Sequence, residues 1–336
     1  MPVLTPTRPR ARLPLADAAF QRVCHVVPAV EWATMADDVE AIWRLKRQRN
    51  AVILAHNYMT PEIFHGVADI TGDSLALARQ AASVDADVIV LAGVHFMAET
   101  AKLLNPDKTV LIPDLRSGCS LAESITAEDV QALKQAHPGV PVVAYVNTSA
   151  AVKAESDICC TSGNAEEVVR SLGVERLIMI PDQYLAANIA AKTGVEVITH
   201  PGACEVHERF TPRDIEQIRL DHPGVTVLAH PECPPPVVQA ADYAGSTADM
   251  VEYVAGIEPG AQPATVALIT ECSMSDNVAQ LYPGVAFVRP CNLCPHMKRN
   301  TLGSIRRSLE TMTHEVALRP ETAARALAAV QRMLEV

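Results

Sequence analysis

The feature that most constrains the fold of this chain is an internal repeat of 85 to 90 residues. The tetrapeptide HPGV starts at His137 and again at His222, 85 residues later. Cys204 also lies 85 residues after Cys119, and Cys294 follows Cys204 by 90 residues. Self-similarity at a fixed period indicates that one structural unit is copied along the chain. The sequence therefore predicts three similar units.

Each copy has the same order of predicted elements. A helical stretch precedes a short apolar strand that ends in alanine and a polar ring, as in AVILAH at 51–56, VPVVAY at 140–145 and VTVLAH at 225–230. A turn containing glycine then opens a second helix, and two further apolar strands lead to a cysteine. Apolar runs without alternation, separated by helices, are typical of parallel strands covered on both faces. Right-handed crossovers bring the carboxyl ends of such strands to one edge of the sheet.

We therefore expect an α/β fold of three homologous three-layer units, whose parallel sheets have a pseudo-threefold arrangement around a central cavity. The expected divisions are an N-terminal arm at 1–35, units at 36–124, 125–210 and 211–300, and C-terminal helices at 301–336. Residues 1 to about 20 of the arm are expected to be flexible. The last segment is expected to form two helices separated near Pro320.

The composition suits a soluble enzyme and not a nucleic-acid or membrane protein. The chain has 336 residues, of which 49% are hydrophobic and 20% charged, and its formal net charge is −11. An acidic chain lacks the basic surface that releases counterions from nucleic acid or anionic lipid. No apolar run reaches the roughly 18 residues of a membrane span, and the N-terminal segment lacks the apolar core of a signal peptide. We therefore expect a cytoplasmic protein without nucleic-acid or membrane partners.

The nine cysteines point to metal ligation or reactive thiols, because disulfide frameworks do not persist in a reducing compartment. Cys119, Cys204 and Cys294 occupy equivalent ends of the three units, and three converging thiolates suit a soft metal centre. A four-iron cluster held by three cysteines would keep one iron open as a Lewis acid. Zinc, a closed cluster with Cys291 as the fourth ligand, and simple burial of the thiols remain alternatives at this point.

The other six cysteines are expected to be structural: Cys24, Cys159, Cys160, Cys233, Cys272 and Cys291. Cys291 and Cys294 form a C-x-x-C pair, which suggests a disulfide that would remove a metal ligand under oxidation. Thiol mapping with and without oxidant tests this hypothesis, and a permanently free Cys291 would contradict it.

Polar side chains follow the first strand of every unit, where parallel sheets carry their ligand sites. They are His56 and Tyr58 in the first unit, Tyr145 and Asn147 in the second, and His230 and Glu232 in the third. Glu232 is the candidate general acid or base, because a carboxylate near a metal and a histidine can have its pKa tuned toward neutrality. A capped strand end or a surface ion pair is the structural alternative for these residues.

Four hydroxyl side chains lie in glycine-containing turns that open helices: Ser74, Ser162, Ser246 and Thr247. A hydroxyl together with the free backbone N–H groups of a helix start can bind an anion. Each could equally be an ordinary helix cap. Their repetition in all three units favours an anionic substrate in a shared cavity. His207, three residues after Cys204, could orient the metal centre or the substrate.

Dense motifs between about residue 50 and residue 303 resemble those of quinolinate synthase, the A protein of bacterial NAD biosynthesis. They are AHNY at 55–58, GDSL at 72–75, GVHFMAETAK at 93–102, GCS at 118–120, YVNTSAAVKAESDICCTSGNA at 145–165, PDQYLA at 181–186, GACEVHE at 202–208, HPEC at 230–233, DYAGST at 242–247, TECSM at 270–274 and CPHMKRNTL at 294–302. The resemblance implies a fold of three homologous α/β units around a central 4Fe-4S cluster.

By this resemblance, Cys119, Cys204 and Cys294 bind one 4Fe-4S cluster per chain, and the C-P-x-M-x-x-N context selects Cys294 over Cys291. The family reaction condenses iminoaspartate with dihydroxyacetone phosphate to quinolinate, with release of phosphate and two waters. An L-aspartate oxidase or an aspartate dehydrogenase would supply the iminoaspartate. The sequence leaves the oligomeric state open, and a homodimer is compatible with it.

The resemblance also gives roles to the polar strand ends. His56 and Tyr58 become active-site residues, with the Tyr58 ring closing over the substrate, while Tyr145 and Asn147 hydrogen-bond a substrate carboxylate. The catalytic candidates are Glu232, His230, Tyr58 and His56. The candidate substrate contacts are His56, Ser74, Tyr145, Asn147, Ser162, His230, Glu232, Ser246 and Thr247.

Two other function classes compete with the synthase. A hydro-lyase with an open iron, as in aconitase, shares iron-assisted loss of water but not these motifs. A cluster-bearing redox sensor or electron carrier would need a fourth cysteine ligand and no cavity of histidine, tyrosine, asparagine and glutamate. The polar residues at the strand ends argue against this second alternative.

Overall fold

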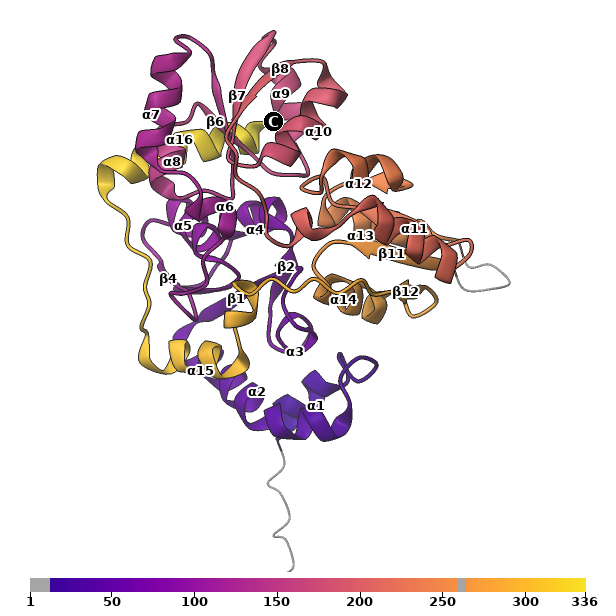
Figure 1. Cartoon of the computed structure of the whole chain (residues 1–336). Coiled ribbons are helices and arrows are strands. Elements are labelled where there is room, and N and C mark those ends of the chain that lie inside the picture. The colour runs from indigo at the N-terminus through magenta and orange to yellow at the C-terminus, as the bar shows by residue number, and fades with distance from the viewer. Residues whose placement is uncertain (1–12, 259–263) are drawn as a thin grey trace, which may run out of the picture.

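The computed structural model describes residues 13–258 and 264–336, and within them the chain forms three four-stranded parallel sheets (Figure 1). The first sheet contains β1 (Ala51–His56), β2 (Ile70–Gly72), β3 (Val88–Ala92) and β4 (Thr109–Leu111). The second contains β5 (Val142–Tyr145), β6 (Ile158–Cys160), β7 (Arg176–Ile180) and β8 (Glu196–Thr199). The third contains β9 (Thr226–Ala229), β10 (Tyr243–Ala244), β11 (Thr265–Ile269) and β12 (Ala286–Val288). The predicted α/β fold of three similar units is confirmed.

All three sheets have the same strand order, in which the second strand lies at one edge and is followed by the first, third and fourth strands. The central strands are buried because they lie between layers of helices; every residue of β3, for example, is buried. The chain leaves the first strand toward one edge of the sheet and the third strand toward the other. A crevice opens at such a reversal, beyond the carboxyl ends of the strands, and ligands bind there in sheets of this kind.

Helices connect the strands and cover the sheets. In the first unit they are α2 (Ala29–Arg49), α3 (Pro61–Phe64), α4 (Ser74–Ala81), α5 (His95–Leu104) and α6 (Ser120–Glu123). The second unit has α7 (Ala127–Ala136), α8 (Ala150–Ala154), α9 (Ala165–Ser171), α10 (Gln183–Thr193) and the 3-10 turn η1 (His207–Arg209). The third has α11 (Pro212–Asp221), α12 (Pro235–Ala240), α13 (Thr247–Ala255), α14 (Ser273–Leu281) and the 3-10 turn η2 (Met297–Arg299).

Each cysteine-bearing loop ends in the same kind of helix start. Thr126, Thr211 and Thr301 each stand seven residues after the cysteine of their unit. Each is the N-cap of the next helix, and its hydroxyl oxygen accepts a hydrogen bond from the backbone N–H three residues further on. Such caps satisfy backbone donors that the helix itself leaves free. The repeat therefore fixes where the loop ends as well as where its cysteine lies.

The N-terminal segment is more ordered than its sequence predicts. Helix α1 (Pro14–Phe20) buries Ala16 and Ala19, and the backbone N–H groups of Leu15 and Ala16 donate to the Glu40 carboxylate of α2 at 2.8 and 3.0 Å. The prediction of flexibility up to about residue 20 is wrong for residues 14–20, because a capping carboxylate from α2 satisfies the helix start. Residues 1–12 lie outside the described part of the chain.

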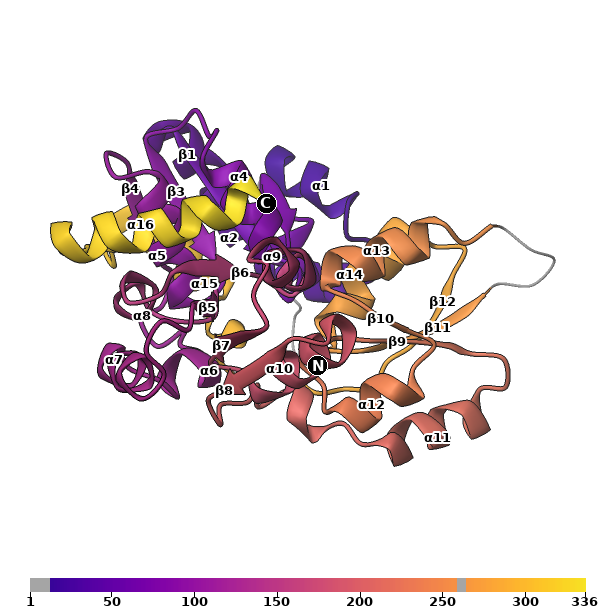
Figure 2. The same cartoon turned by 90° about the horizontal axis from the view of Figure 1, so that it is seen from above.

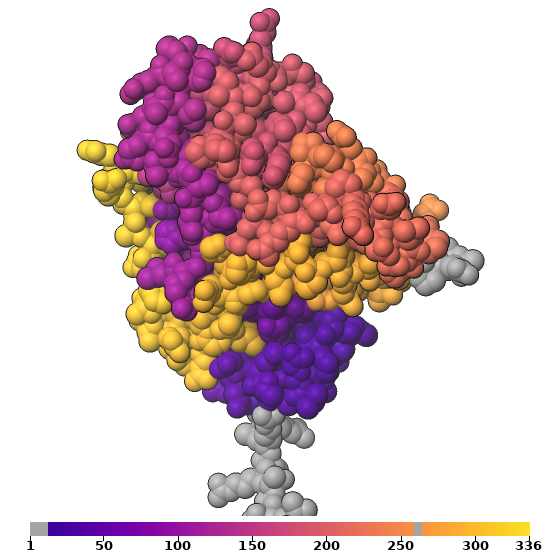
Figure 3. Space-filling view, in the orientation of Figure 1, coloured from indigo at the N-terminus to yellow at the C-terminus, as the bar shows by residue number. Residues whose placement is uncertain are grey.

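The last segment forms two helices, α15 (Leu302–Thr311) and α16 (Pro320–Glu335), and the second of them begins at Pro320, near which the sequence predicts a break. Helix α15 packs on α2, and α16 packs on α5 of the first unit and on α8 and β6 of the second. Figures 2 and 3 show this C-terminal segment, in yellow, along the side of the first two units. Among the described residues, every helix is too short or too polar to span a lipid bilayer.

Packing of the first strand predicts a measurable stability effect. Leu54 in β1 is fully buried, so Leu54→Ala should destabilise the fold by about 2–5 kcal/mol through lost burial and a residual cavity. The denaturant midpoint of unfolding measures the effect. Leu220 is 68% exposed, and Leu220→Ala is the matched control, with an expected change within about 0.5 kcal/mol. Equal midpoints for the two variants would contradict the described core.

Candidate active site

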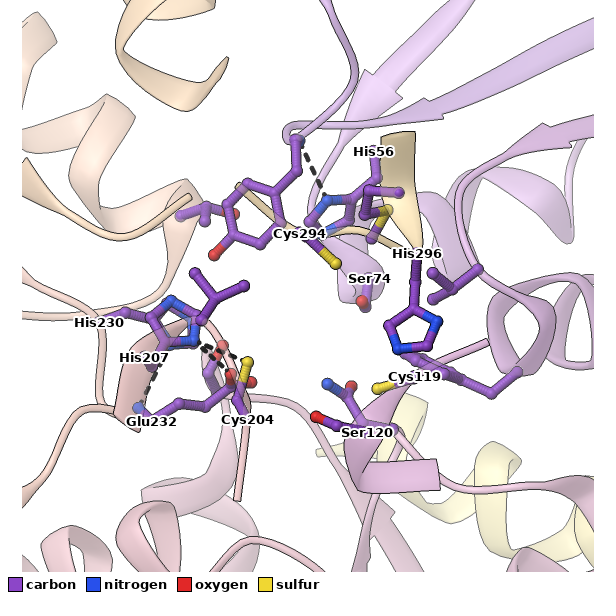
Figure 4. Close-up of a pocket in the computed structure, with 18 of the residues that line it drawn as sticks. His56, Ser74, Cys119, Ser120, Cys204, His207, His230, Glu232, Cys294 and His296 are labelled. Atoms are coloured by element: carbon purple, nitrogen blue, oxygen red, sulfur yellow. Dashed lines mark hydrogen bonds and ion pairs between the residues drawn. The ribbon is translucent and has the colours of Figure 1, made fainter. Parts of the chain in front are cut away.

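The three units meet at one cavity with an empty volume of about 700 Å³. Its wall includes the residues that end or follow the first strand of each sheet and the three cysteine-bearing loops (Figure 4). His207 lines this cavity, and so do twelve of the thirteen candidate catalytic, substrate-binding and metal-ligating residues: His56, Tyr58, Ser74, Cys119, Tyr145, Asn147, Ser162, Cys204, His230, Glu232, Thr247 and Cys294. Residues at equivalent positions of the three repeats therefore line the same cavity.

The sulfur atoms of Cys119, Cys204 and Cys294 point toward the same space from three sides (Figure 4). Each cysteine begins a helical turn, and its carbonyl oxygen accepts a hydrogen bond from the N–H group four residues later at 2.9, 3.0 and 3.2 Å, respectively. None of the three is in a disulfide. The loops thus present three thiols in equivalent local conformations.

The surroundings of these thiols favour the protonated form but carry directed donors. Burial raises the pKa of Cys119 to about 12, and it also raises the pKa values of Cys204 and Cys294. The backbone N–H groups two and three residues beyond each cysteine bond its sulfur and act in the opposite direction. A bound cation would displace the thiol protons, and these N–H groups would then stabilise three thiolates.

A continuous hydrogen-bond chain crosses the cavity wall beside Cys204. Tyr145 donates its hydroxyl proton to Oε1 of Glu232, and Oε2 of Glu232 lies 2.7 Å from Nδ1 of His207. Nε2 of His207 lies 2.9 Å from the Thr270 hydroxyl, which lies 2.6 Å from the hydroxyl of Tyr58. Tyr58 and Glu232 are therefore connected through two intervening side chains.

The carboxylate fixes the direction of this chain. With Glu232 ionised and a neutral ring at His207, Nδ1 of His207 donates to the carboxylate, so its Nε2 accepts from Thr270, whose oxygen accepts from Tyr58. Burial by itself raises the pKa of Glu232, but the neighbouring histidines His207 and His230 outweigh burial and hold that pKa below its usual value. The expected tuning of this pKa toward neutrality is therefore wrong for the unliganded cavity, in which Glu232 is a charged acceptor.

Two further histidines are held in defined tautomers. Nδ1 of His56 accepts from the N–H of Tyr58 at 3.2 Å, and Nδ1 of His230 accepts from the N–H of Glu232 at 3.3 Å. The ring proton of each neutral imidazole then lies on Nε2. Burial lowers the pKa of His56 to about 4 and that of His230 to about 3. Both rings are therefore neutral single donors at neutral pH.

The lowered pKa of His56 predicts a dependence of stability on pH. The unfolded chain takes up this proton near pH 6.5 and the folded chain only near pH 4, so acidification between these values destabilises the fold by up to about 1.4 kcal/mol per pH unit. Unfolding midpoints of metal-free protein across this range should fall less steeply for His56→Asn than for the wild type. His222→Asn, at an exposed position, is the control, and an unchanged slope in His56→Asn would contradict the burial argument.

Three of the four predicted anion-binding hydroxyls line the cavity: Ser74, Ser162 and Thr247. Ser246 is instead fully buried and caps α13, with its hydroxyl donating to Asp249 and accepting from the Asp249 N–H. Its expected substrate contact stays a prediction, and the structure shows the capping role. Thr247 accepts from the Asn57 side chain at 2.9 Å, so its own O–H remains to be donated.

Asn147 lies in a turn whose backbone is held by hydrogen bonds from a buried lysine, Lys153. Nζ of Lys153 donates to the carbonyl oxygens of Val146 and Thr148, the residues on either side of Asn147. Oδ1 of Asn147 is buried and has no hydrogen-bond partner among the described residues. Because buried amides are normally paired, this orphaned atom indicates that a ligand completes its bonding.

Several cavity residues were not singled out in the sequence, although they lie within the quoted motifs. Ser120, Glu205 and His296 line the cavity next to the cysteines, and His296 pairs with Glu205 at 3.0 Å. Phe96 contributes apolar wall. Thr270 completes the hydrogen-bond chain from a fully buried position. In the sequence, the only mark of these residues is that they lie close to a candidate ligand cysteine or to a strand end. That position does not distinguish residues that line the cavity from their neighbours.

The fold and cavity define a class of protein. It is a three-unit α/β protein in which three cysteine thiols and a histidine–glutamate–tyrosine network line one cavity. The family model described as quinolinate synthetase A protein matches residues 40–335. The chain belongs to this family.

Its relatives cover nearly its whole length. Quinolinate synthase 1 of Mesorhizobium japonicum is 68% identical over 324 residues, which are 96% of this chain and 99% of the relative. The quinolinate synthase of Agrobacterium fabrum is 67% identical over 321 residues, which are 96% of this chain and 92% of the relative. That of Caulobacter vibrioides is 56% identical over 320 residues, which are 94% of this chain and 86% of the relative.

Proposed function

We propose that this chain is a quinolinate synthase that condenses iminoaspartate with dihydroxyacetone phosphate to quinolinate, releasing phosphate and two waters. The observation that carries the proposal is the meeting of three equivalent thiols with the Glu232–His207 pair in one cavity. Family membership supports the reaction, and its product is a precursor in NAD biosynthesis. We place the enzyme in the cytoplasm, where an aspartate oxidase or dehydrogenase would supply iminoaspartate.

The residues present fit one 4Fe-4S cluster per chain. Cys119, Cys204 and Cys294 supply three soft donors from three directions, and two backbone N–H groups face each sulfur. Hydrogen bonds to sulfur are among the features by which proteins tune such clusters. When bound, a cluster held by three thiolates supplies an open iron that acts as a Lewis acid toward a substrate oxygen.

The polar wall suits a phosphate and two carboxylates. Ser74 and Thr247 are the first residues of α4 and α13 and line the cavity, so their hydroxyls can donate to an anion, while Asp73 and Ser246 cap the two helix starts. His56 and His230 each offer one Nε2–H without carrying a charge. These neutral donors can bind anions without holding the product through a full ion pair. Asn147 orients a further polar group of the substrate.

Proton movement is assigned to the network around Glu232. Its carboxylate is ionised and therefore has a lone pair that can accept a proton from a substrate carbon or hydroxyl. Tyr58 can take a proton from the substrate while its own hydroxyl proton moves through Thr270 and His207 toward Glu232. Water is limited by burial, because His207, His230 and Glu232 are each no more than 3% exposed. Exclusion of water protects an imine substrate from hydrolysis.

The direct test is anaerobic reconstitution with iron and sulfide, followed by an assay for quinolinate. Protein loaded with about four irons per chain receives dihydroxyacetone phosphate and oxaloacetate with ammonia, or an iminoaspartate-generating enzyme. Quinolinate formation that requires all components supports the proposal. Loaded, folded protein that makes no quinolinate would reject the reaction, and protein that holds no iron would reject the cluster.

A further inference from the structure

Two cysteines outside the cavity lie directly against each other. The Sγ atoms of Cys272 and Cys291 are 2.7 Å apart, and both thiols are free. A disulfide bond brings two sulfurs to about 2.05 Å. The two side chains therefore already have nearly the separation that a covalent bridge requires.

The backbone holds this pair in place. Glu271 and Asn292 form an isolated parallel bridge that extends the pairing of β11 and β12, and the Cys272 N–H donates to the Asn292 carbonyl at 3.3 Å. The Asn292 side chain in turn donates to the Val206 carbonyl at 3.3 Å. Cys272 and Cys291 stand one residue beyond and one residue before this bridge. Their proximity follows from paired backbone and not from mobile side chains.

The repeat itself does not require cysteines here. The second unit has the corresponding parallel bridge between Asp182 and Gly202. The residues that match Cys272 and Cys291 in position there are Gln183 and Pro201. The fold therefore accepts other side chains at these places, and the thiol pair is a specific feature of the third unit.

Cys291 and Cys294 face different surroundings although only two residues separate them. Cys291 is exposed and lines a surface groove with Arg209 and Phe210, whereas Cys294 lines the central cavity. We propose that Cys272 and Cys291 are a modification site, a dithiol that small-molecule disulfides oxidise reversibly, and that this disulfide leaves Cys294 available to the cluster. The earlier hypothesis of a Cys291–Cys294 disulfide is untested, and the geometry favours Cys272 as the partner.

The oxidation proceeds by two thiol–disulfide exchanges. The exposed Cys291 thiolate attacks one sulfur of the small disulfide, forming a mixed disulfide and releasing one small thiolate. The Cys272 thiolate then attacks the Cys291 sulfur, forming the protein disulfide and releasing the second small thiolate. Two electrons pass from the protein cysteines to the small disulfide, and their two protons end on the two released thiols.

The Cys272–Cys291 disulfide would tether the loop that carries Cys294, the proposed metal ligand. It closes a covalent ring through α14 and β12 and ties the segment just before Cys294 to the end of β11. It also removes an exposed thiol close in sequence to Cys294, one that could otherwise compete for the metal or react with oxidants. Oxidation at this site is thus expected to preserve the centre, in contrast to oxidation of Cys294 itself.

The test treats iron-loaded full-length protein with glutathione disulfide under anaerobic conditions. Peptide mapping should find a Cys272–Cys291 crosslink, intact mass should fall by about 2 Da, and dithiothreitol should restore the starting mass. The iron content should stay unchanged, and the oxidised protein should unfold at a higher temperature than the reduced protein. This expectation of retained iron rests on the proposed function, but the crosslink does not.

Variants separate the outcomes. Cys272→Ser should stop at the mixed disulfide, with glutathione retained on Cys291, and Cys291→Ser should lose the Cys272–Cys291 crosslink. Neither variant should show the thermal shift, whereas Cys24→Ser, at another exposed cysteine, should keep both the crosslink and the shift. In the wild-type protein, a Cys291–Cys294 crosslink, a stable glutathione adduct on Cys291, or iron loss in step with the Cys272–Cys291 crosslink would overturn the proposal. If the reduced protein binds no iron on reconstitution, that result counts against the proposed function only, because the mass and peptide measurements do not depend on iron.

Discussion

A Glu232→Gln variant is expected to fold, retain its cluster and lose turnover by on the order of a thousandfold. Glutamine keeps the size of the side chain but cannot accept a proton at neutral pH. It also cannot pair with both its neighbours as the carboxylate does, since Tyr145 and His207 both donate to Glu232. The chain from Tyr58 through Thr270 would then lose its terminal acceptor.

Steady-state kinetics of reconstituted protein, with iron content and thermal unfolding measured on the same samples, check this result. Glu216→Gln removes a carboxylate from an exposed position of α11 and is the matched control, with an expected turnover within a factor of about two of the wild type. A fully loaded Glu232→Gln enzyme with near wild-type turnover would remove Glu232 from the proton chemistry. A raised KM with unchanged turnover would show that Glu232 binds substrate and does not transfer a proton.

The sequence predicted the central strands of each unit because they are continuous apolar runs of four to six residues at repeated positions. It did not predict the edge strands β2, β6 and β10, which have only two or three residues each. Edge strands this short carry no periodicity. One of them, β2, also contains Gly72, and glycine is uncommon in strands. Their pairing depends on the neighbouring first strand, which only the folded chain provides.

The cavity could be predicted at the level of strand ends but not at the level of contacts. Repeat positions brought His56, Tyr145 and His230 together, because equivalent strand ends face one centre. They could not show that Thr270 joins Tyr58 to His207, since this contact crosses between units. Likewise, a serine in a glycine turn can cap a helix or face a ligand, and Ser246 shows that position alone does not decide between the two.

The pKa of Glu232 illustrates a further limit of sequence reasoning. Proximity to histidine and to a metal site suggested tuning toward neutrality. The result depends on distance and orientation: the Glu232 carboxylate lies 2.7 Å from Nδ1 of His207 and accepts from Tyr145. These contacts outweigh burial and keep the pKa low. No sequence pattern specifies which of these opposing effects is larger.

A Cys294→Ala variant is expected to lose nearly all of the reconstituted iron, from about four irons per chain to almost none, and with it all quinolinate formation. Two cysteines cannot hold a cubane that needs three protein thiolates, and no other side chain of the cavity replaces the missing sulfur, because Cys291 lines a different surface. Cys291→Ala is the matched control and should keep full iron. The reverse pattern in these two variants would overturn the ligand assignment.

Zinc is the alternative that Cys294→Ala and Glu232→Gln together resolve. Ligand atoms of Cys204, His207 and Glu232 lie within 4.8 Å of one another, and such a mixed sulfur, nitrogen and oxygen set suits zinc. A zinc ion on that trio would not need Cys294, so Cys294→Ala would still bind about one zinc per chain. A cluster needs Cys294 but not Glu232, so Glu232→Gln would keep iron where a zinc site would be weakened. Metal analysis of the two variants therefore distinguishes a three-thiolate cluster at the centre of the three units from a zinc ion bound to residues of the second and third units.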